Sequence, residues 1–172
     1  MRRYTLPIVL AAAALTGLSA PQTFAASPSA SRQDQSFLVQ AHQGNLAEIA
    51  AGKDAQAHAT TACVKKAGET WVRDHTKLDA SVQKLAAATG TKLPSKPSAA
   101  DREQFAAVQA KAGTAAYDKA WLKLGDAGHR KTLDAVDKEI RDGKNSKVVA
   151  GARAARPVVV MHLNMIRGGV CR

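Results

Sequence analysis

Four side chains able to bind a metal ion stand at positions where an apolar residue is expected. His75 takes the fourth place on an apolar stripe whose steps alternate between four and three residues: Val64, Gly68, Trp71, His75, Leu78, Val82 and Leu85. His129 and His162 lie on comparable stripes later in the chain, and Glu48 lies on the inward face of the first periodic segment. Imidazole and carboxylate ligands suit zinc, copper, nickel or iron(II). These four residues are therefore candidate ligands of one divalent transition-metal ion.

The histidines have two interpretations at this stage. A histidine on an apolar stripe is usually a core residue bonded to a neighbour, and three of them could form a structural cluster of that kind. A di-iron centre would need Glu-x-x-His on two helices, whereas only Asp126-x-x-His129 keeps a carboxylate at that spacing. A helical rise of ~1.5 Å per residue brings the four candidates to similar heights. The sequence favours the structural cluster and leaves a mononuclear metal site as the alternative.

The stripes require several helices to position them. The expected helices run from Asp34 or Ser36 to Ala59, from Thr61 to Gly90, from Ser98 to Ala112, from Thr114 to Asp142, and from Asn145 or Ser146 to Gly168. Pro157 falls inside the last helix and predicts a kink there. Aromatic residues make up only 4% of the chain, and no alternating strand pattern is present. We therefore expect an all-α four-helix bundle with one short extra helix before the third long one.

The first residues have the pattern of a secretory signal peptide. Arg2 and Arg3 precede an apolar run from Leu6 to Leu18, and small residues around Ala25 follow. We expect a signal peptide over residues 1–25, a disordered tether over 26–33 and a single domain over 34–170. The apolar run is too short to span a bilayer comfortably, so no transmembrane span is expected in the mature protein. Its expected location is the secreted or extracytoplasmic space, in association with the cell envelope.

Two cysteines support that location and constrain the topology. Cys63 and Cys171 are far apart in sequence and lack a second metal-binding neighbour, so a disulfide is expected in an exported chain. Cys63 opens the second helix and Cys171 follows the last one. A plain up-down-up-down bundle would put them at opposite ends, beyond the ~5.5 Å Cα separation that a disulfide needs. A crossover carried by the linker from Thr89 to Asp101 would bring them together.

The last helix is strongly basic, within a chain whose net charge is +11. Residues 143–172 contain no acidic residue, and we single out four cations at the start of this segment: Lys144, Lys147, Arg153 and Arg156. Such a strip is either a solvated face or a surface that binds anionic cell-wall polymers or lipid head groups. Nucleic acid is not an expected partner of an exported protein.

Several longer segments resemble a known family of exported bacterial proteins. They are FLVQAHQGNLAEIAAGKDAQ, VKKAGETWVRDHTKLDASVQKLAAATGTKLP, AYDKAWLKLGDAGHRKTLD and VVVMHL. The chain is similar to domain-of-unknown-function family 4142, whose members are often labelled outer-membrane proteins. The resemblance implies export and a ferritin-like bundle, and it brings no established activity. The chain departs from the family at Gly128, where an aspartate usually precedes the histidine.

Other chemistry finds little support in the residues. Trp71 and Trp121 are interpreted as packing residues, and His42 and His58 as ordinary, partly exposed positions. The sequence contains no Cys-x-x-Cys-His for haem, no glycine-rich loop for a nucleotide, and no nucleophile motif for a catalytic triad. The expected function is a non-enzymatic binding or structural module of the cell envelope. The alternative is a metal-binding or redox protein that uses the Glu/His cluster.

Overall fold

A computed structural model describes residues 29–167 and 171 of the chain, and within them it contains helices and no strand. The five helices of these residues are α1 (Arg32–His58), α2 (Ala62–Thr89), α3 (Ala99–Gln109), α4 (Ala115–Asp142) and α5 (Ser146–Arg167). The all-α prediction is confirmed. None of the helices in the described part of the chain has the length and apolar character to cross a membrane. The expected signal peptide over 1–25 and the stop at Gly168 lie outside the described residues.

The helix ends follow the capping residues, with one shift. Ser31, rather than Asp34 or Ser36, caps α1: its hydroxyl accepts from the Asp34 N–H, and the Asp34 carboxylate accepts from the Ser31 N–H. Because of this capping box, α1 begins at Arg32, inside the segment expected to be a tether. Gly90 ends α2 with a φ of 69°, a left-handed conformation that glycine adopts without strain.

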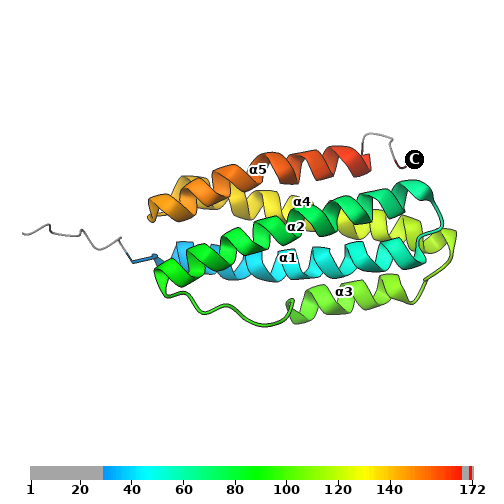
Figure 1. The fold of residues 1–172 in the computed structure, drawn as a ribbon, viewed down its shortest axis with the longest axis horizontal. Helices are drawn as coiled ribbons and strands as arrows, with labels where there is room; N and C mark the ends of the chain where they lie inside the picture. The colour runs from blue at the N-terminus through cyan, green and yellow to red at the C-terminus, as the bar shows by residue number, and fades with distance from the viewer. Residues whose placement is uncertain (1–28, 168–170, 172) are drawn as a thin grey trace, which may run out of the picture.

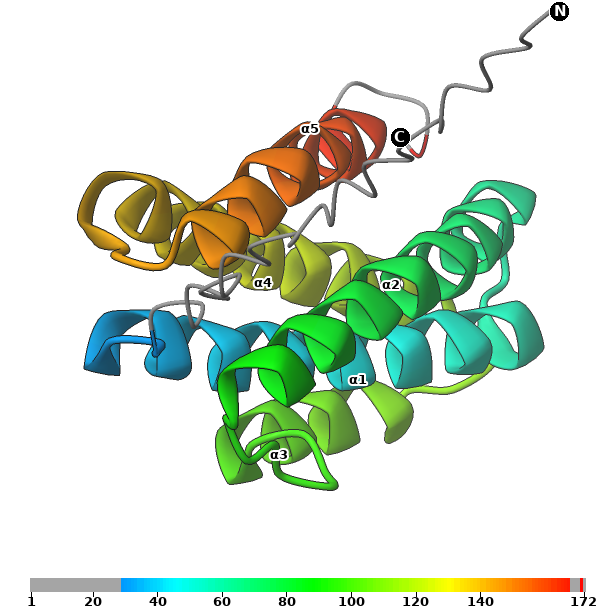
Figure 2. The same ribbon diagram turned by 60° about the vertical axis from the view of Figure 1, so that its left-hand side comes forward.

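The helices form two antiparallel pairs joined by a crossover. In Figure 1, α1 and α2 run in opposite directions, as do α4 and α5, and the chain returns from the end of α2 to the start of α4 along the side of the bundle. The backbone N–H of Gly113 donates to the carbonyl of His58, so the α3–α4 turn contacts the end of α1. The expected crossover is present, but the extended linker makes only part of it. Helix α3 completes it, running alongside α1 and antiparallel to α4 (Figure 2).

The disulfide between Cys63 and Cys171 is present, with the Cα atoms 5.2 Å apart. It joins the start of α2 to the chain beyond α5, which the crossover brings to the same end of the bundle. The prediction of both the bond and its topological consequence is confirmed.

The helices α1 and α2 approach each other closely at two glycines. A Cβ built on Gly52 or Gly68 would lie 2.6 Å from the carbonyl oxygen of the other, so only glycine permits this contact between α1 and α2.

Two apolar clusters fill the bundle on either side of a polar layer. One cluster, towards the disulfide, contains Ala55, Ala59, Val64, Ala67, Trp71, Val108, Tyr117, Trp121, Leu163 and Ile166. The other, towards the start of α1, contains Phe37, Leu38, Val82, Ala86, Val136, Val148 and Ala152. On α1, α2 and α4 the buried residues Asn45, His75 and His129 lie between members of the two clusters, and His162 lies next to Leu163 on α5. The polar candidates therefore occupy one layer across the middle of the core.

Candidate metal centre

The three histidines of the polar layer meet in the core. His75 on α2, His129 on α4 and His162 on α5 are 3%, 1% and 0% exposed. Nε2 of His129 lies 3.4 Å from Nε2 of His75 and 3.1 Å from Nδ1 of His162. These three nitrogens all lie within 4.8 Å of one another. We call His75, His129 and His162 the histidine triad, and these converging atoms its inner nitrogens.

The other nitrogen of each ring contacts an oxygen that can only accept a hydrogen bond. Nδ1 of His75 lies 2.9 Å from the side-chain oxygen of Asn45, and Nδ1 of His129 lies 2.9 Å from the carbonyl oxygen of Gly125. Nε2 of His162 lies 3.2 Å from Oδ2 of Asp74. A neutral imidazole carries one proton, so these partners assign it to the outer nitrogen of each ring. The inner nitrogens are then lone pairs that face one another.

The electrostatic environment keeps the triad neutral. Burial, followed by the neighbouring histidines, lowers the pKa of His75 well below its ordinary value of 6.5. Burial also lowers the pKa of His129 to about 4 and lowers that of His162, although Asp74 opposes the shift at His162. Three neutral imidazoles whose outer N–H groups are held by oxygens are the arrangement found around protein-bound metals. The same donor set suits zinc, copper, nickel and iron(II).

Trp71 packs against one face of the triad. Its indole ring lies 4.6 Å from the His129 ring and stacks on Trp121 at 4.1 Å between centroids. Gly125 leaves room for it, since a Cβ at this position would clash with the Trp71 ring. The Trp121 N–H donates to the carbonyl of Ala51, whereas the buried Trp71 N–H has no hydrogen-bond partner among the described residues. Both tryptophans are core residues.

Glu48 contacts the triad from its outer side. Its Oε1 atom lies 3.6 Å from Nδ1 of His129, the ring nitrogen that points away from the inner nitrogens. Burial, with a contribution from Asp101, raises the pKa of Glu48 to about 8. Its side chain borders a cavity of about 110 Å³ between α1, α3 and α4, next to Gly128 and Lys131. The structure thus brings the three histidines together and does not bring Glu48 to the same point. Asp126, the other candidate carboxylate, pairs with Arg130 and Arg167.

The hydrogen-bonding partners of the triad include two side chains that the sequence analysis did not select. Asn45 stands midway between Leu38 and Gly52 at seven-residue steps, so its place on the inward face of α1 was readable from the sequence. Asp74 precedes His75 directly, and only the packing of α5 against α2 turns it into a partner of His162. It is also held by Arg73 through two hydrogen bonds of 2.7 and 2.9 Å.

His42 differs from its expected exposure. It is only 7% exposed, and its Nδ1 atom lies 2.6 Å from Oδ1 of the buried Asp79. The expectation of a partly exposed residue is therefore wrong for His42, because α2 covers this part of α1. His58 is exposed as expected, with its ring next to Asp54.

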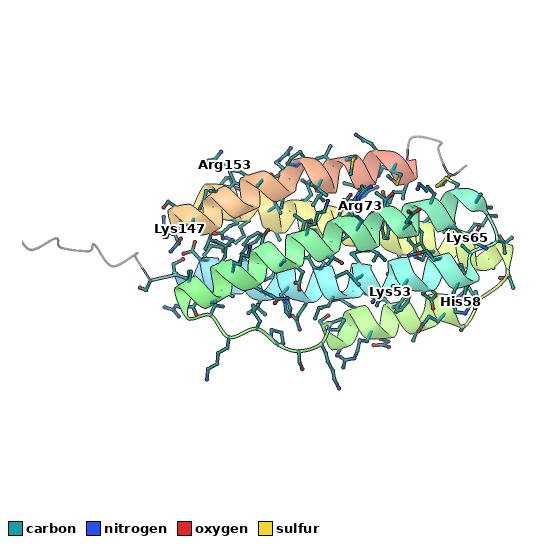
Figure 3. All side chains as sticks on the ribbon, viewed as in Figure 1. Lys53, His58, Lys65, Arg73, Lys147 and Arg153 are labelled. Carbon is teal, nitrogen blue, oxygen red and sulfur yellow. A yellow bond between two sulfur atoms is a disulfide. The ribbon has the colours of Figure 1, made fainter. Side chains whose placement is uncertain are left out.

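The basic residues of α5 lie on the surface. Lys144, Lys147, Arg153 and Arg156 are all exposed. Figure 3 shows Arg153 on the outer side of α5 and Lys147 at the end where α5 begins. Arg156 forms two hydrogen bonds of 2.7 and 3.2 Å with the carboxylate of Asp137 on α4, so part of its charge is compensated locally.

Comparison with known proteins places the chain in a family. Searches found no match among curated proteins and none among solved structures. The sequence pattern of the family described as Domain of unknown function (DUF4142) matches residues 19–168, which include all five helices and the whole histidine triad. The chain belongs to the DUF4142 family.

Proposed function

We propose that this protein binds one divalent transition-metal ion through His75, His129 and His162. The observation that carries the proposal is the convergence of three lone pairs, each fixed by an oxygen acceptor on the far side of its ring. A metal ion can bind these nitrogens without deprotonation of any imidazole and without a flip of any histidine ring. Glu48 is not part of the ligand set in this proposal, because it contacts the opposite edge of His129.

The alternative, a purely structural cluster, fits the same contacts less well. In a self-satisfied network a donor faces each acceptor, as in the pairing of the Trp121 N–H with the Ala51 carbonyl. Between the inner nitrogens no proton is supplied by any of the three neutral rings. Their contacts of 3.1 and 3.4 Å therefore join acceptor to acceptor, an arrangement that a cation stabilises.

The setting of this function is an exported protein with a ferritin-like bundle. The single crossover between α2 and α4 is the connection that distinguishes ferritin-like bundles from simple up-and-down ones. The Cys63–Cys171 disulfide supports an extracytoplasmic location, since such bonds form and persist in oxidising compartments.

The test is the metal-dependent shift in melting temperature. Zinc, nickel or copper should raise the melting temperature of the wild-type protein, because a ligand of the folded state adds RT ln(1 + [L]/Kd) to its stability. His75→Ala should lose this shift. His42→Ala is the matched control, since it also removes a buried, hydrogen-bonded histidine between α1 and α2 but leaves the triad intact. Equal shifts in all three proteins, or none in any, would show that the triad is not a metal site.

A second role rests on a separate surface. The exposed cations Lys144, Lys147 and Arg153 lie on the α4–α5 turn and the first half of α5 and favour contact with anionic cell-wall polymers or lipid head groups. Retention on purified cell walls should weaken as salt is raised and should fall when Lys147, Arg153 and Arg156 are changed to Gln. Retention that is unaffected by both changes would leave the strip as a solvated face.

A further inference from the structure

The two faces of the histidine triad are packed differently. Towards the disulfide, the next helical turn carries Trp71, Gly125 and Ile166, four residues from His75, His129 and His162 respectively. The Trp71 ring fills the space above Gly125 and lies against His129, so this face is closed.

On the other face, the next turn of each helix borders a cavity. Leu78, Thr132 and Val159 are three residues from His75, His129 and His162, in the direction of the start of α1, and all three line a cavity of about 50 Å³. His75 itself and its partner Asn45 line the cavity too. The cavity therefore touches the triad at His75 and lies one helical turn from His129 and His162.

The size and lining of the cavity restrict what can enter it. One water needs ~10–15 Å³ of such space, so there is room for a molecule of a few atoms. Among the described residues that line it, none is Asp, Glu, Lys or Arg, and most are apolar. An ion would lose its hydration without compensation here, whereas a small uncharged molecule would not.

We propose that a metal held by the triad keeps one coordination position open towards this cavity and binds there a diatomic gas of the size and polarity of dioxygen. This inference rests on the proposed metal site. Three protein ligands leave a fourth position free in a tetrahedral complex. Trp71 closes the face towards the disulfide, so the open position is expected on the other face, where the cavity borders His75.

Carbon monoxide is the probe, because it is uncharged, diatomic and reports its own binding. The untagged protein is loaded with copper(II), reduced to Cu(I) by a thiol-free one-electron reductant in the absence of oxygen, so that the disulfide is kept, and titrated with carbon monoxide. The C–O stretching band is followed by infrared spectroscopy, and bound copper is measured by elemental analysis. One carbon monoxide per copper and a single band are expected.

Filling the cavity should separate gas binding from metal binding. Gly44 lines both this cavity and the one beside Glu48, and a Cβ built on it meets no atom within 4 Å, so the chain can accommodate Gly44→Leu. Ala155→Leu fills the cavity from the opposite wall, and Ala154→Leu on the exposed face of α5 is its control. The two filling variants should keep their copper and bind carbon monoxide at least tenfold more weakly, and the control should behave as wild type.

The outcomes distinguish the two proposals. Loss of copper from the wild-type protein would overturn the metal site together with this inference. Copper that is retained but binds no carbon monoxide would overturn the inference alone. The same holds if carbon monoxide binds equally well to both filling variants and to wild type.

Discussion

The buried carboxylates Asp34 and Asp118 at the ends of the bundle differ from the histidine triad at its centre in how their atoms are hydrogen-bonded. Asp34 accepts hydrogen bonds from the backbone N–H groups of Ser31, Lys144 and Asn145, which ties the start of α1 to the α4–α5 turn. Asp118 accepts from Thr60 and Thr61 and ties the start of α4 to the α1–α2 turn. Each carboxylate oxygen thus faces donors, whereas each inner nitrogen of the triad faces other acceptors.

The pKa values follow the same division. Burial alone would raise the pKa of Asp34 and of Asp118, yet their hydrogen bonds lower both below the ordinary value. In the triad burial is the largest cause and lowers the histidine pKa values, and the acceptors at the outer nitrogens, Gly125 at His129 and Asp74 at His162, oppose it only in part. A buried polar group with a full set of partners holds the fold together. The inner nitrogens of the triad instead face only one another.

The largest effect expected from this comparison is at Asp34. Asp34→Ala leaves the N–H groups of Lys144 and Asn145 buried without an acceptor and removes the capping box of α1. The free energy of unfolding should fall by about 3 kcal/mol or more, as for other buried hydrogen-bonded charges that lose their counterpart. Urea denaturation measures this change. A loss below about 1 kcal/mol would mean that the end of the bundle does not depend on this carboxylate.

An intermediate effect is expected from pH, with opposite signs in the two regions. Burial raises the pKa of Glu139, next to Asp34, to about 7 from 4.5, although Gln33 opposes the shift. Between these pH values the folded chain keeps a proton that the unfolded chain releases, so this contribution to stability falls as pH rises.

The histidine triad has the opposite effect on the pH dependence of stability. The pKa of His129 is about 4 in the folded chain against 6.5 ordinarily, so the unfolded chain binds the extra proton and stability rises from pH 4 to 6.5. Metal-free Glu139→Gln should therefore gain stability more steeply over this range than wild type does, as measured by denaturation at pH 4.5, 5.5 and 6.5. Parallel curves for the two proteins would contradict the assignment to Glu139.

The smallest effect is expected at the centre of the triad. His129→Leu removes a ring whose outer N–H donates to Gly125, a carbonyl that the helix backbone already uses. The replacement is apolar and of similar size, so the metal-free protein should change in stability by less than about 1 kcal/mol. The same variant should lose the metal-dependent rise in melting temperature. A large loss of stability without metal would instead show that the triad holds the fold together as the carboxylates do.

The hydrophobic periodicity of the sequence predicted much of the fold, because it indicates which face of each helix is buried. It identified the helices and the three histidines on their stripes, while the disulfide was predicted from the two cysteines of a chain expected to be exported. It did not find Ser31 as the cap of α1, since Asp34 and Ser36 have equally good capping side chains. Nor did it reveal that α3 completes the crossover, because the direction of a short helix depends on packing with α1 and α4.

The partners of the triad illustrate the same limit. Glu48 and His75 both lie on inward faces, but periodicity does not tell which edge of His129 a side chain will meet. Asp74 points away from the stripe of its own helix, so its role follows only from the position of α5. The hydrophobic pattern of a single helix cannot predict contacts that a residue beside the apolar stripe makes with a neighbouring helix.

The Cys63–Cys171 bond also constrains the chain after it has unfolded. It closes a ring of chain that contains His75, His129 and His162, and it leaves α1 outside that ring as an open tail. In the oxidised chain the three imidazoles therefore belong to one macrocycle, and loop closure limits how far apart they can drift after unfolding. Oxidation thus keeps the three histidines closer to one another in the unfolded chain than they would be in the reduced one.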